Sequence, residues 1–291
     1  MSRKTTEKQP TKRGQSKKNK GETEPIHHLF DTQFVREYVN LVTMLIERGY
    51  EMEGTIGVDV YDDMPPNFEY TDEERENGII KGSGDIYYKL SNDNSEIQRQ
   101  LTAKYHGLES FSMRTKHINP NLEMLIYYLL PEAESGSSSE RKQLSEDQVK
   151  HYVDVFDRDT TANRLMLISR VKPSADSMII INTANQMLRS IKPLCLIRLM
   201  ESSFFSFNPA MWFLQPKDLV IYRDEDKQTV LEELDVHQSL KGKEETLLPY
   251  MRESDPFALY YGLAVGDVVS FTRAEPKIVY MRVVVPDVDT M

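Results

Sequence analysis

The segment of residues 247–285 constrains the fold more than any other part of the sequence, and it reads LLPYMRESDPFALYYGLAVGDVVSFTRAEPKIVYMRVVV. Asp255 is placed to accept hydrogen bonds from the free amides of a helix that opens with Pro256, because the fixed φ of proline suits the first helical position. Gly262 can adopt the left-handed conformation that ends this helix after about two turns. The segment therefore predicts a short, well-capped helix.

Two stretches after this helix are typical of a terminal β-hairpin. Gly266 turns the chain into the strand of residues 267–273, and residues 278–285, rich in β-branched side chains, form the returning strand. The tight connection is residues 274–277. Because side chains alternate along a strand, we expect one face of residues 267–273 to pack on a core and the other to stay free for a partner.

Length and composition exclude several classes of protein. At roughly 150 residues per domain, the 291 residues suggest two domains, and 39% hydrophobic residues suffice for packed cores. No apolar run approaches the ~18 residues that span a bilayer, and the first 25 residues hold no apolar signal-peptide stretch. We expect a soluble, intracellular protein without membrane contact. The single Cys195 excludes an internal disulfide and zinc sites of paired cysteines, and it is most simply a core residue.

The net charge of −10 is unevenly distributed along the chain. Residues 1–20 carry eight Lys or Arg against one acid, Glu7, so this stretch has a charge of +7 and the remainder −17. An acidic body argues against broad wrapping of nucleic acid. We expect residues 1–25 to be a disordered basic tail that acts as a nuclear-import signal or a loose polyanion contact, or that only aids solubility. Its candidate nucleic-acid residues are Lys12, Arg13, Lys17 and Lys18.

The first folded element is a helix over residues 32–48. Its apolar residues recur at helical spacing from Phe34 to Ile46, with Asp31 or Thr32 as N-cap and Gly49 at its end. Two strand-like pieces follow, residues 55–61 and 85–90. Residues 121–130 form another apolar block.

Residues 131–148 are rich in Ser, Glu and Lys and predict an exposed insertion. Ser145 and Gln148 have the spacing of a capping box for a second amphipathic helix. Three apolar runs come next, and each predicts a strand: residues 165–171, 178–181 and 194–200. The polar residues 183–189, between the last two runs, predict a short helix. This order favours an α+β layer.

A second unit is predicted to begin near Asn208-Pro209, an N-cap followed by proline. It contains a predicted strand over residues 211–214 and a helix over residues 227–234. The domain boundaries that we infer are a tail of residues 1–25, an N-terminal domain of residues 26–207 and a C-terminal domain of residues 208–291.

Enzyme motifs are absent: the sequence has no Gly-x-Gly-x-x-Gly, Walker lysine loop, His-Glu-x-x-His or Gly-x-Ser-x-Gly. Acid and lysine pairs resemble those of metal-dependent nucleases, but such pairs are frequent in a chain this charged: Asp85 with Lys89, and Glu225 with Lys227. The adjacent His27 and His28 have no third metal ligand nearby. We expect no catalytic residue, metal site or cofactor.

The C-terminal segment resembles the shared fifth-largest subunit of eukaryotic nuclear RNA polymerases and the archaeal counterpart of that subunit. The matching residues follow the family pattern without a gap: Leu248-Pro249-Tyr250-Met251, Asp255-Pro256, Tyr260-Tyr261-Gly262-Leu263, Gly266-Asp267-Val268-Val269 and Arg273. Weaker similarity covers Arg48-Gly49-Tyr50 at the end of the first helix and Phe207-Asn208-Pro209-Ala210.

The resemblance implies an α+β protein in which an N-terminal jaw domain, with helices on a mixed sheet, precedes a small C-terminal α/β assembly domain. Its function would be that of a non-catalytic subunit of a nuclear or nucleolar DNA-directed RNA polymerase. It would dock on the largest subunit, contact other subunits, contribute the lower jaw near downstream DNA and form no homo-oligomer. The implied partner-binding residues are Leu248, Pro249, Asp255, Pro256, Tyr261, Gly262, Gly266, Val269, Arg273 and Arg282.

Departures from the family pattern suggest a divergent paralogue, trypanosomatid-like or viral. The family's Pro-Lys-His is replaced by Ile221-Tyr222-Arg223, the hairpin connection is shortened, and Met281 replaces a tyrosine. Two alternatives stay open: a metal-dependent nuclease-like enzyme, and an adaptor of transcription or ribosome assembly outside the polymerase.

Overall fold

The computed structural model describes residues 30–61, 68, 70–83, 86–130, 144–192, 194–208, 217–233, 248–273 and 278–287. Several expectations fall on residues outside these ranges: the basic tail, His27, His28, Asp85, residues 131–143 of the insertion, the strand of residues 211–214 and the connection of residues 274–277. The described residues form three sheets and seven α-helices, so the predicted α+β class is confirmed.

The helices are α1 Thr32–Glu47, α2 Asp72–Glu76, α3 Asn94–Lys104, α4 Glu146–Arg158, α5 Ala175–Arg189, α6 Asp224–Glu233 and α7 Pro256–Tyr261. The strands are β1 Val58–Val60, β2 Ile79–Lys81, β3 Tyr87–Leu90, β4 Ser112–Lys116, β5 Glu123–Leu129, β6 Arg164–Ser169, β7 Leu196–Glu201, β8 Lys217–Tyr222, β9 Tyr250–Arg252, β10 Val268–Arg273 and β11 Ile278–Val285. Short 3₁₀ turns lie at Leu108–Ser110 and Ser202–Ser206.

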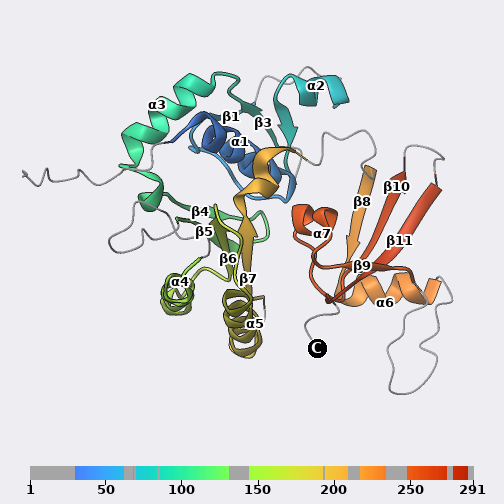
Figure 1. The fold of residues 1–291 in the computed structure, drawn as a ribbon. Coiled ribbons are helices and arrows are strands. Elements are labelled where there is room, and N and C mark those ends of the chain that lie inside the picture. The colour runs from blue at the N-terminus through green and yellow to red at the C-terminus, as the bar shows by residue number, and fades with distance from the viewer. Residues whose placement is uncertain are drawn as a thin grey trace, which may run out of the picture.

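The N-terminal part is organised around the mixed sheet β4-β5-β6-β7, with α1 on one face and α4 and α5 on the other (Figure 1). Strand β5 shows how the sequence produces these layers. Ile126 and Tyr128 point into the core around α1, whereas Leu125 and Leu129 pack with α4 and α5. Because apolar residues occur at both the odd-numbered and the even-numbered positions of β5, the strand is buried on both faces.

Helix α1 is the centre of the larger core. Asp31 caps it by accepting the Phe34 amide at 2.7 Å, and Gly49 ends it with φ +86°, as the sequence predicts. The small sheet β1-β3-β2 and helix α3 pack against the same core. One buried carboxylate in this core, Glu37, accepts a hydrogen bond from the Tyr128 hydroxyl.

The strand predicted at residues 178–181 is wrong, because these residues lie within α5. Four successive apolar residues are too few to distinguish a helix from a strand by periodicity. The longer pattern is helical, since Ser177, Ile181, Ala184 and Leu188 are the buried residues of α5. The helix is also what the sheet requires, because β6 and β7 are parallel and need a crossover between them.

Other local predictions need correction in the N-terminal part. The capping box does not form: Ser145 makes no side-chain cap, and Gln148 donates to the Leu130 carbonyl at 3.0 Å instead. Because α4 begins at Glu146, the end of the predicted insertion is helical. The elements α2, β2, α3 and β4 had no clear signal in a polar stretch of sequence.

The C-terminal sheet has the order β8-β10-β11-β9, with β9 parallel to β11 and the other pairs antiparallel. Helix α7 covers one face and lies between this sheet and the N-terminal part (Figure 1). Ala258 and Leu263 pack there on Val269, Phe271 and Val284. None of the helices in the described ranges combines the length and the apolar character needed to cross a membrane.

The helical assignment of residues 178–181 yields a test with a matched pair of variants. Ile181 is 3% exposed and Ile179 is 59% exposed, whereas in a strand both would face the same side. We expect Ile181→Asp to lower the free energy of unfolding by about 3 kcal/mol or more, and Ile179→Asp to change it by less than about 0.5 kcal/mol. Urea denaturation measures both values, and equal losses would contradict the helix.

Candidate functional site

The helix predicted from Asp255 to Gly262 forms as expected. The Asp255 carboxylate accepts the Phe257 amide at 2.8 Å, Pro256 occupies the first turn, and Gly262 ends the helix with φ +68°. The Leu263 amide then donates to the Ala258 carbonyl at 2.9 Å. These residues act on the backbone, since they fix where α7 begins and ends.

The second turn is held by Gly266 and Asp267. Gly266 has φ +93°, and its amide donates to the Val284 carbonyl at 2.9 Å. The Asp267 carboxylate is buried, accepts the Ala264 amide at 2.9 Å and forms an ion pair with Arg223 at 2.9 Å. This pairing anchors the start of β10 to the end of β8.

The remaining residues implied by the resemblance differ in exposure. Pro249 is exposed, and its carbonyl accepts the Val283 amide at 3.1 Å, while Leu248 beside it is half-buried. Arg282 donates to the Tyr250 carbonyl at 3.0 Å. These contacts join β9 to β11.

Two aromatic contacts hold the outer residues of this group. The exposed Arg273 lies over the Tyr280 ring, 4.8 Å from its centroid. The half-buried Tyr261 ring lies 4.8 Å from that of Phe257. Of the two, Arg273 offers its side chain more fully to a partner.

The expectation of a free face on the strand of residues 267–273 is wrong. Val269 and Phe271 lie in the core under α7, and Val268 and Ser270 on the opposite face are 0% and 7% exposed. In a small unit, the central strand has to be covered on both sides to exclude water from its core. The Val269 side chain therefore has no surface of its own to offer a partner.

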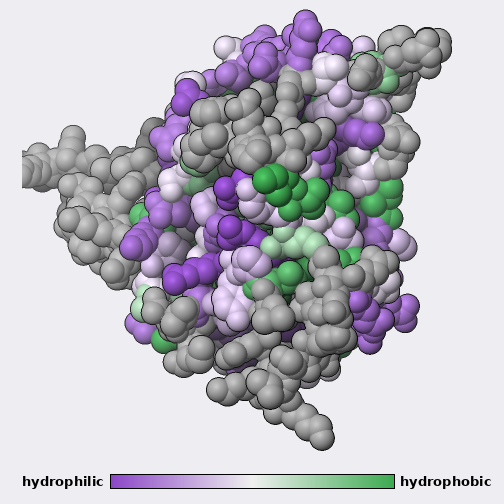
Figure 2. Space-filling view, turned by 90° about the vertical axis from the view of Figure 1, so that its right-hand side faces the viewer, coloured by the Kyte–Doolittle hydropathy of each residue, from purple (hydrophilic) through white to green (hydrophobic). Residues whose placement is uncertain are grey.

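Exposed apolar residues lie instead on the strands around β10. Paired residues of neighbouring strands share a face, and the register places Val220, Tyr250 and Val279 on the face opposite to Val269. Their exposed fractions are 47%, 52% and 66%. Figure 2 views the molecule from the side of this sheet and shows hydrophobic residues gathered near the centre, with hydrophilic ones around them. We call Val220, Tyr250 and Val279 the outer apolar face.

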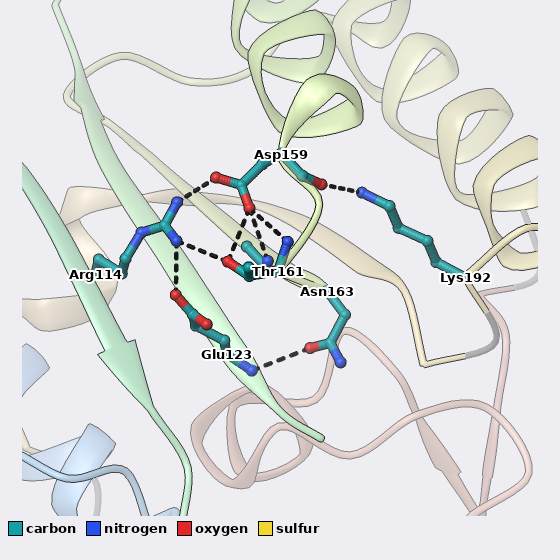
Figure 3. Close-up of polar contacts among 7 residues, drawn as sticks. Arg114, Glu123, Asp159, Thr161, Asn163 and Lys192 are labelled. Carbon is teal, nitrogen blue, oxygen red and sulfur yellow. Dashed lines mark hydrogen bonds and ion pairs between the residues drawn. The ribbon is translucent and has the colours of Figure 1, made fainter. Parts of the chain in front are cut away.

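A cluster of charged groups at the end of α4 has the residue types of a catalytic site but is occupied by internal contacts (Figure 3). Arg114 pairs with both Glu123 and Asp159, and Lys192 donates to the Asp159 carbonyl at 2.6 Å. Burial acts to raise the pKa of Asp159, but backbone amides and Arg114 outweigh it and lower this pKa to about 2. The cluster joins α4 to the sheet.

The structure also bears on a metal site and on Cys195. In the part of the chain that the structure describes, no three His, Cys, Asp or Glu side chains are close enough together to hold a metal ion. Cys195 is buried at 2% exposure in the core around α4 and α5, as predicted, and burial raises the pKa of its thiol.

The junction between the N-terminal part and α7 was not predicted. Arg48, directly after α1, donates to the carbonyls of Leu259 and Tyr260, the latter at 2.6 Å. Glu47 beside it accepts the Tyr260 hydroxyl at 2.6 Å and pairs with Arg75. Burial raises the pKa of Glu47, although Arg75 and Tyr260 oppose this. The sequence signal at this place was Arg48-Gly49-Tyr50, which says nothing about a partner more than 200 residues away.

Gly262 offers a test of the junction. Its φ is positive, and a Cβ there would lie 3.4 Å from the Arg48 guanidinium carbon, whereas Gly54, with φ +73°, has open space. Both Gly262→Val and Gly54→Val should lose about 1–3 kcal/mol of unfolding free energy from backbone strain. We expect Gly262→Val to lose more, because its methyl groups press on Arg48. Equal losses in urea denaturation would argue against a tight junction.

Comparison with known families identifies the C-terminal part. Residues 207–284 match the family of the RNA polymerase Rpb5 C-terminal domain. The matched segment contains α6, α7, the strands β8, β9 and β10, and all of β11 except Val285. No curated protein matches the chain. The predicted resemblance is therefore confirmed for this segment: residues 207–284 are similar to the C-terminal domain of the RNA polymerase subunit Rpb5.

Proposed function

We propose that the protein is a non-catalytic structural subunit of a DNA-directed RNA polymerase and that it docks on the largest subunit through its C-terminal domain. The observation that carries the proposal is the match of residues 207–284 to the Rpb5 C-terminal domain. The backbone-setting residues Asp255, Gly262 and Gly266 lie within the match. In this assignment, nucleotide chemistry and its Mg²⁺ belong to the large subunits, and one copy of the chain serves each polymerase.

The outer apolar face supports docking through this domain. Val220, Tyr250 and Val279 leave apolar surface in water on one side of a small sheet, and the aromatic Tyr250 is of a type enriched in protein interfaces. Burying such residues against a partner is favourable by about 25 cal/mol for each Å² of apolar surface. The exposed Arg273 adds a charged group for orientation.

The N-terminal part is proposed to form the lower jaw near downstream DNA. Because the body of the protein is acidic, contact with phosphate should be local and depend on the basic tail, in particular Lys12, Arg13, Lys17 and Lys18. The match of residues 207–284 to the Rpb5 C-terminal domain supports action in the nucleus, and a nucleolar location is part of the proposal.

The docking surface is tested by charging its most exposed residue. Val279→Asp places a charge where the side chain is 66% exposed, so folding should be unaffected and the melting temperature should change little. Affinity purification of the tagged variant should recover the largest polymerase subunit at least about tenfold less well than wild type, since an unpaired charge in an interface costs more than ~1.4 kcal/mol.

A matched control is Ile118→Asp, an apolar residue of the N-terminal part that is 45% exposed. It should leave recovery of the largest subunit unchanged. Equal recovery with Val279→Asp and wild type would remove the outer apolar face from the interface. Recovery of no polymerase subunit by the wild-type chain would contradict the proposed function itself.

The basic tail is tested by replacing Lys12, Arg13, Lys17 and Lys18 with glutamine. Binding of the chain to duplex DNA should weaken, and the slope of log affinity against log salt should become shallower by about 0.9 for each phosphate contact that is lost. Polymerase assembly and thermal stability should stay as in wild type. An unchanged salt slope in a fluorescence-anisotropy titration would show that these residues do not contact DNA.

A further inference from the structure

A pocket at the junction between the N-terminal part and α7 has four arginines in its lining. Its four basic side chains come from separate elements: Arg48 after α1, Arg164 at the start of β6, Arg198 on β7 and Arg223 after β8. Tyr50 and His117 complete its polar wall. Among the described residues that line the pocket, none is Asp or Glu. The pocket is therefore strongly positive.

Two of these arginines retain unused hydrogen-bonding capacity. Arg198 donates through Nη2 to the Leu263 carbonyl, but its Nη1 is buried and has no hydrogen-bond partner among the described residues. The Arg164 side chain makes no hydrogen bond or ion pair within the described part of the chain. A buried guanidinium N–H without an acceptor is costly, so Arg198 favours an acceptor in the pocket, and the unpaired guanidinium of Arg164 can donate to the same acceptor.

The other two arginines are engaged in contacts within the chain. Arg48 binds the carbonyls at the end of α7, and Arg223 is paired with Asp267. They therefore define the walls, whereas Arg164 and Arg198 supply the free donors. His117 is fixed by a 2.7 Å hydrogen bond between its Nε2 and the Arg48 carbonyl.

The lowered pKa values of two pocket arginines also favour a bound anion. Burial lowers the pKa of Arg48 to about 9, and the nearby Arg198 and Arg164 contribute to this decrease. Burial and Arg164 likewise lower the pKa of Arg198 to about 10, although Glu253 and Asp267 oppose this. Several like charges thus lie in a partly desolvated space, and a bound anion would offset their repulsion.

We propose that this pocket binds a single phosphate-like oxyanion, with Arg164 and Arg198 as its main donors, and that the bound ion stabilises the junction between the two parts of the chain. Guanidinium groups present planar pairs of N–H donors that match the oxygens of a phosphate. The cavity of about 70 Å³ is several times the ~10–15 Å³ that one water needs, so a small ion fits.

The test is calorimetric titration of the full chain with sodium phosphate, at an ionic strength held constant with sodium chloride. We expect saturable one-to-one binding. Arg164→Gln should weaken it by about tenfold or more, because a charge-assisted hydrogen bond is lost. The exposed Arg99, which pairs with Glu96 on α3, provides the control, and Arg99→Gln should bind phosphate as wild type does.

A thermal melt separates ion binding from a structural role of Arg164. In chloride, Arg164→Gln should melt at or above the wild-type temperature, because one of the repelling charges is gone. Phosphate should raise the melting temperature of wild type and of Arg99→Gln, but not that of Arg164→Gln. A parallel titration with ATP distinguishes the source of the phosphate: tighter binding than free phosphate would indicate a nucleotide's terminal phosphate.

The proposal is overturned if phosphate has no greater effect than chloride on the wild-type chain, or if Arg164→Gln binds phosphate as tightly as wild type. The first result would mean that the arginines of the pocket do not select an oxyanion. Neither result bears on polymerase assembly, which rests on the match of residues 207–284.

Discussion

The contact between Arg48 and the end of α7 is the interaction on which the relation between the two parts of the chain depends. Helix ends leave carbonyls without partners, and here a guanidinium from the end of α1 supplies the donors for Leu259 and Tyr260. Gly49 directly follows this arginine and ends α1 with a positive φ. A side chain at the end of α1 thus caps α7, which lies far away in the sequence.

The family motif in the C-terminal domain acts mainly on the backbone. Asp255, Gly262 and Gly266 set helix ends and turns, and Asp267 pairs with Arg223. Such residues fix the ends of α7 and the turn into β10. Of the side chains free to meet a partner, Tyr250 and Arg273 lie within the motif, whereas Val220 on β8 and Val279 on β11 lie outside it. The match therefore supports the fold of the docking unit more directly than the chemistry of its surface.

Local sequence signals predicted most features that depend on a few neighbouring residues, such as the capped helix α7 and the ends of α1. They failed where the deciding information was distant. Residues 178–181 have the composition of a strand, but parallel pairing of β6 with β7 requires a helix there. The arginine pocket could not be predicted either, because Arg48, Arg164 and Arg198 lie on separate elements and meet only after the sheet and α7 have packed.

Because the pocket lies at the junction, the stability of the junction depends on the charge in the pocket as well as on hydrogen bonds. Arg48 and Arg198 both donate to carbonyls of the C-terminal part, at Leu259 and Leu263. Without a counter-charge, their mutual repulsion opposes the contacts that hold this part in place, whereas an anion between them converts repulsion into attraction. The rigidity of the junction between the two parts should therefore depend on whether an anion is bound between Arg48 and Arg198. The apolar cores on either side keep each part folded in both cases.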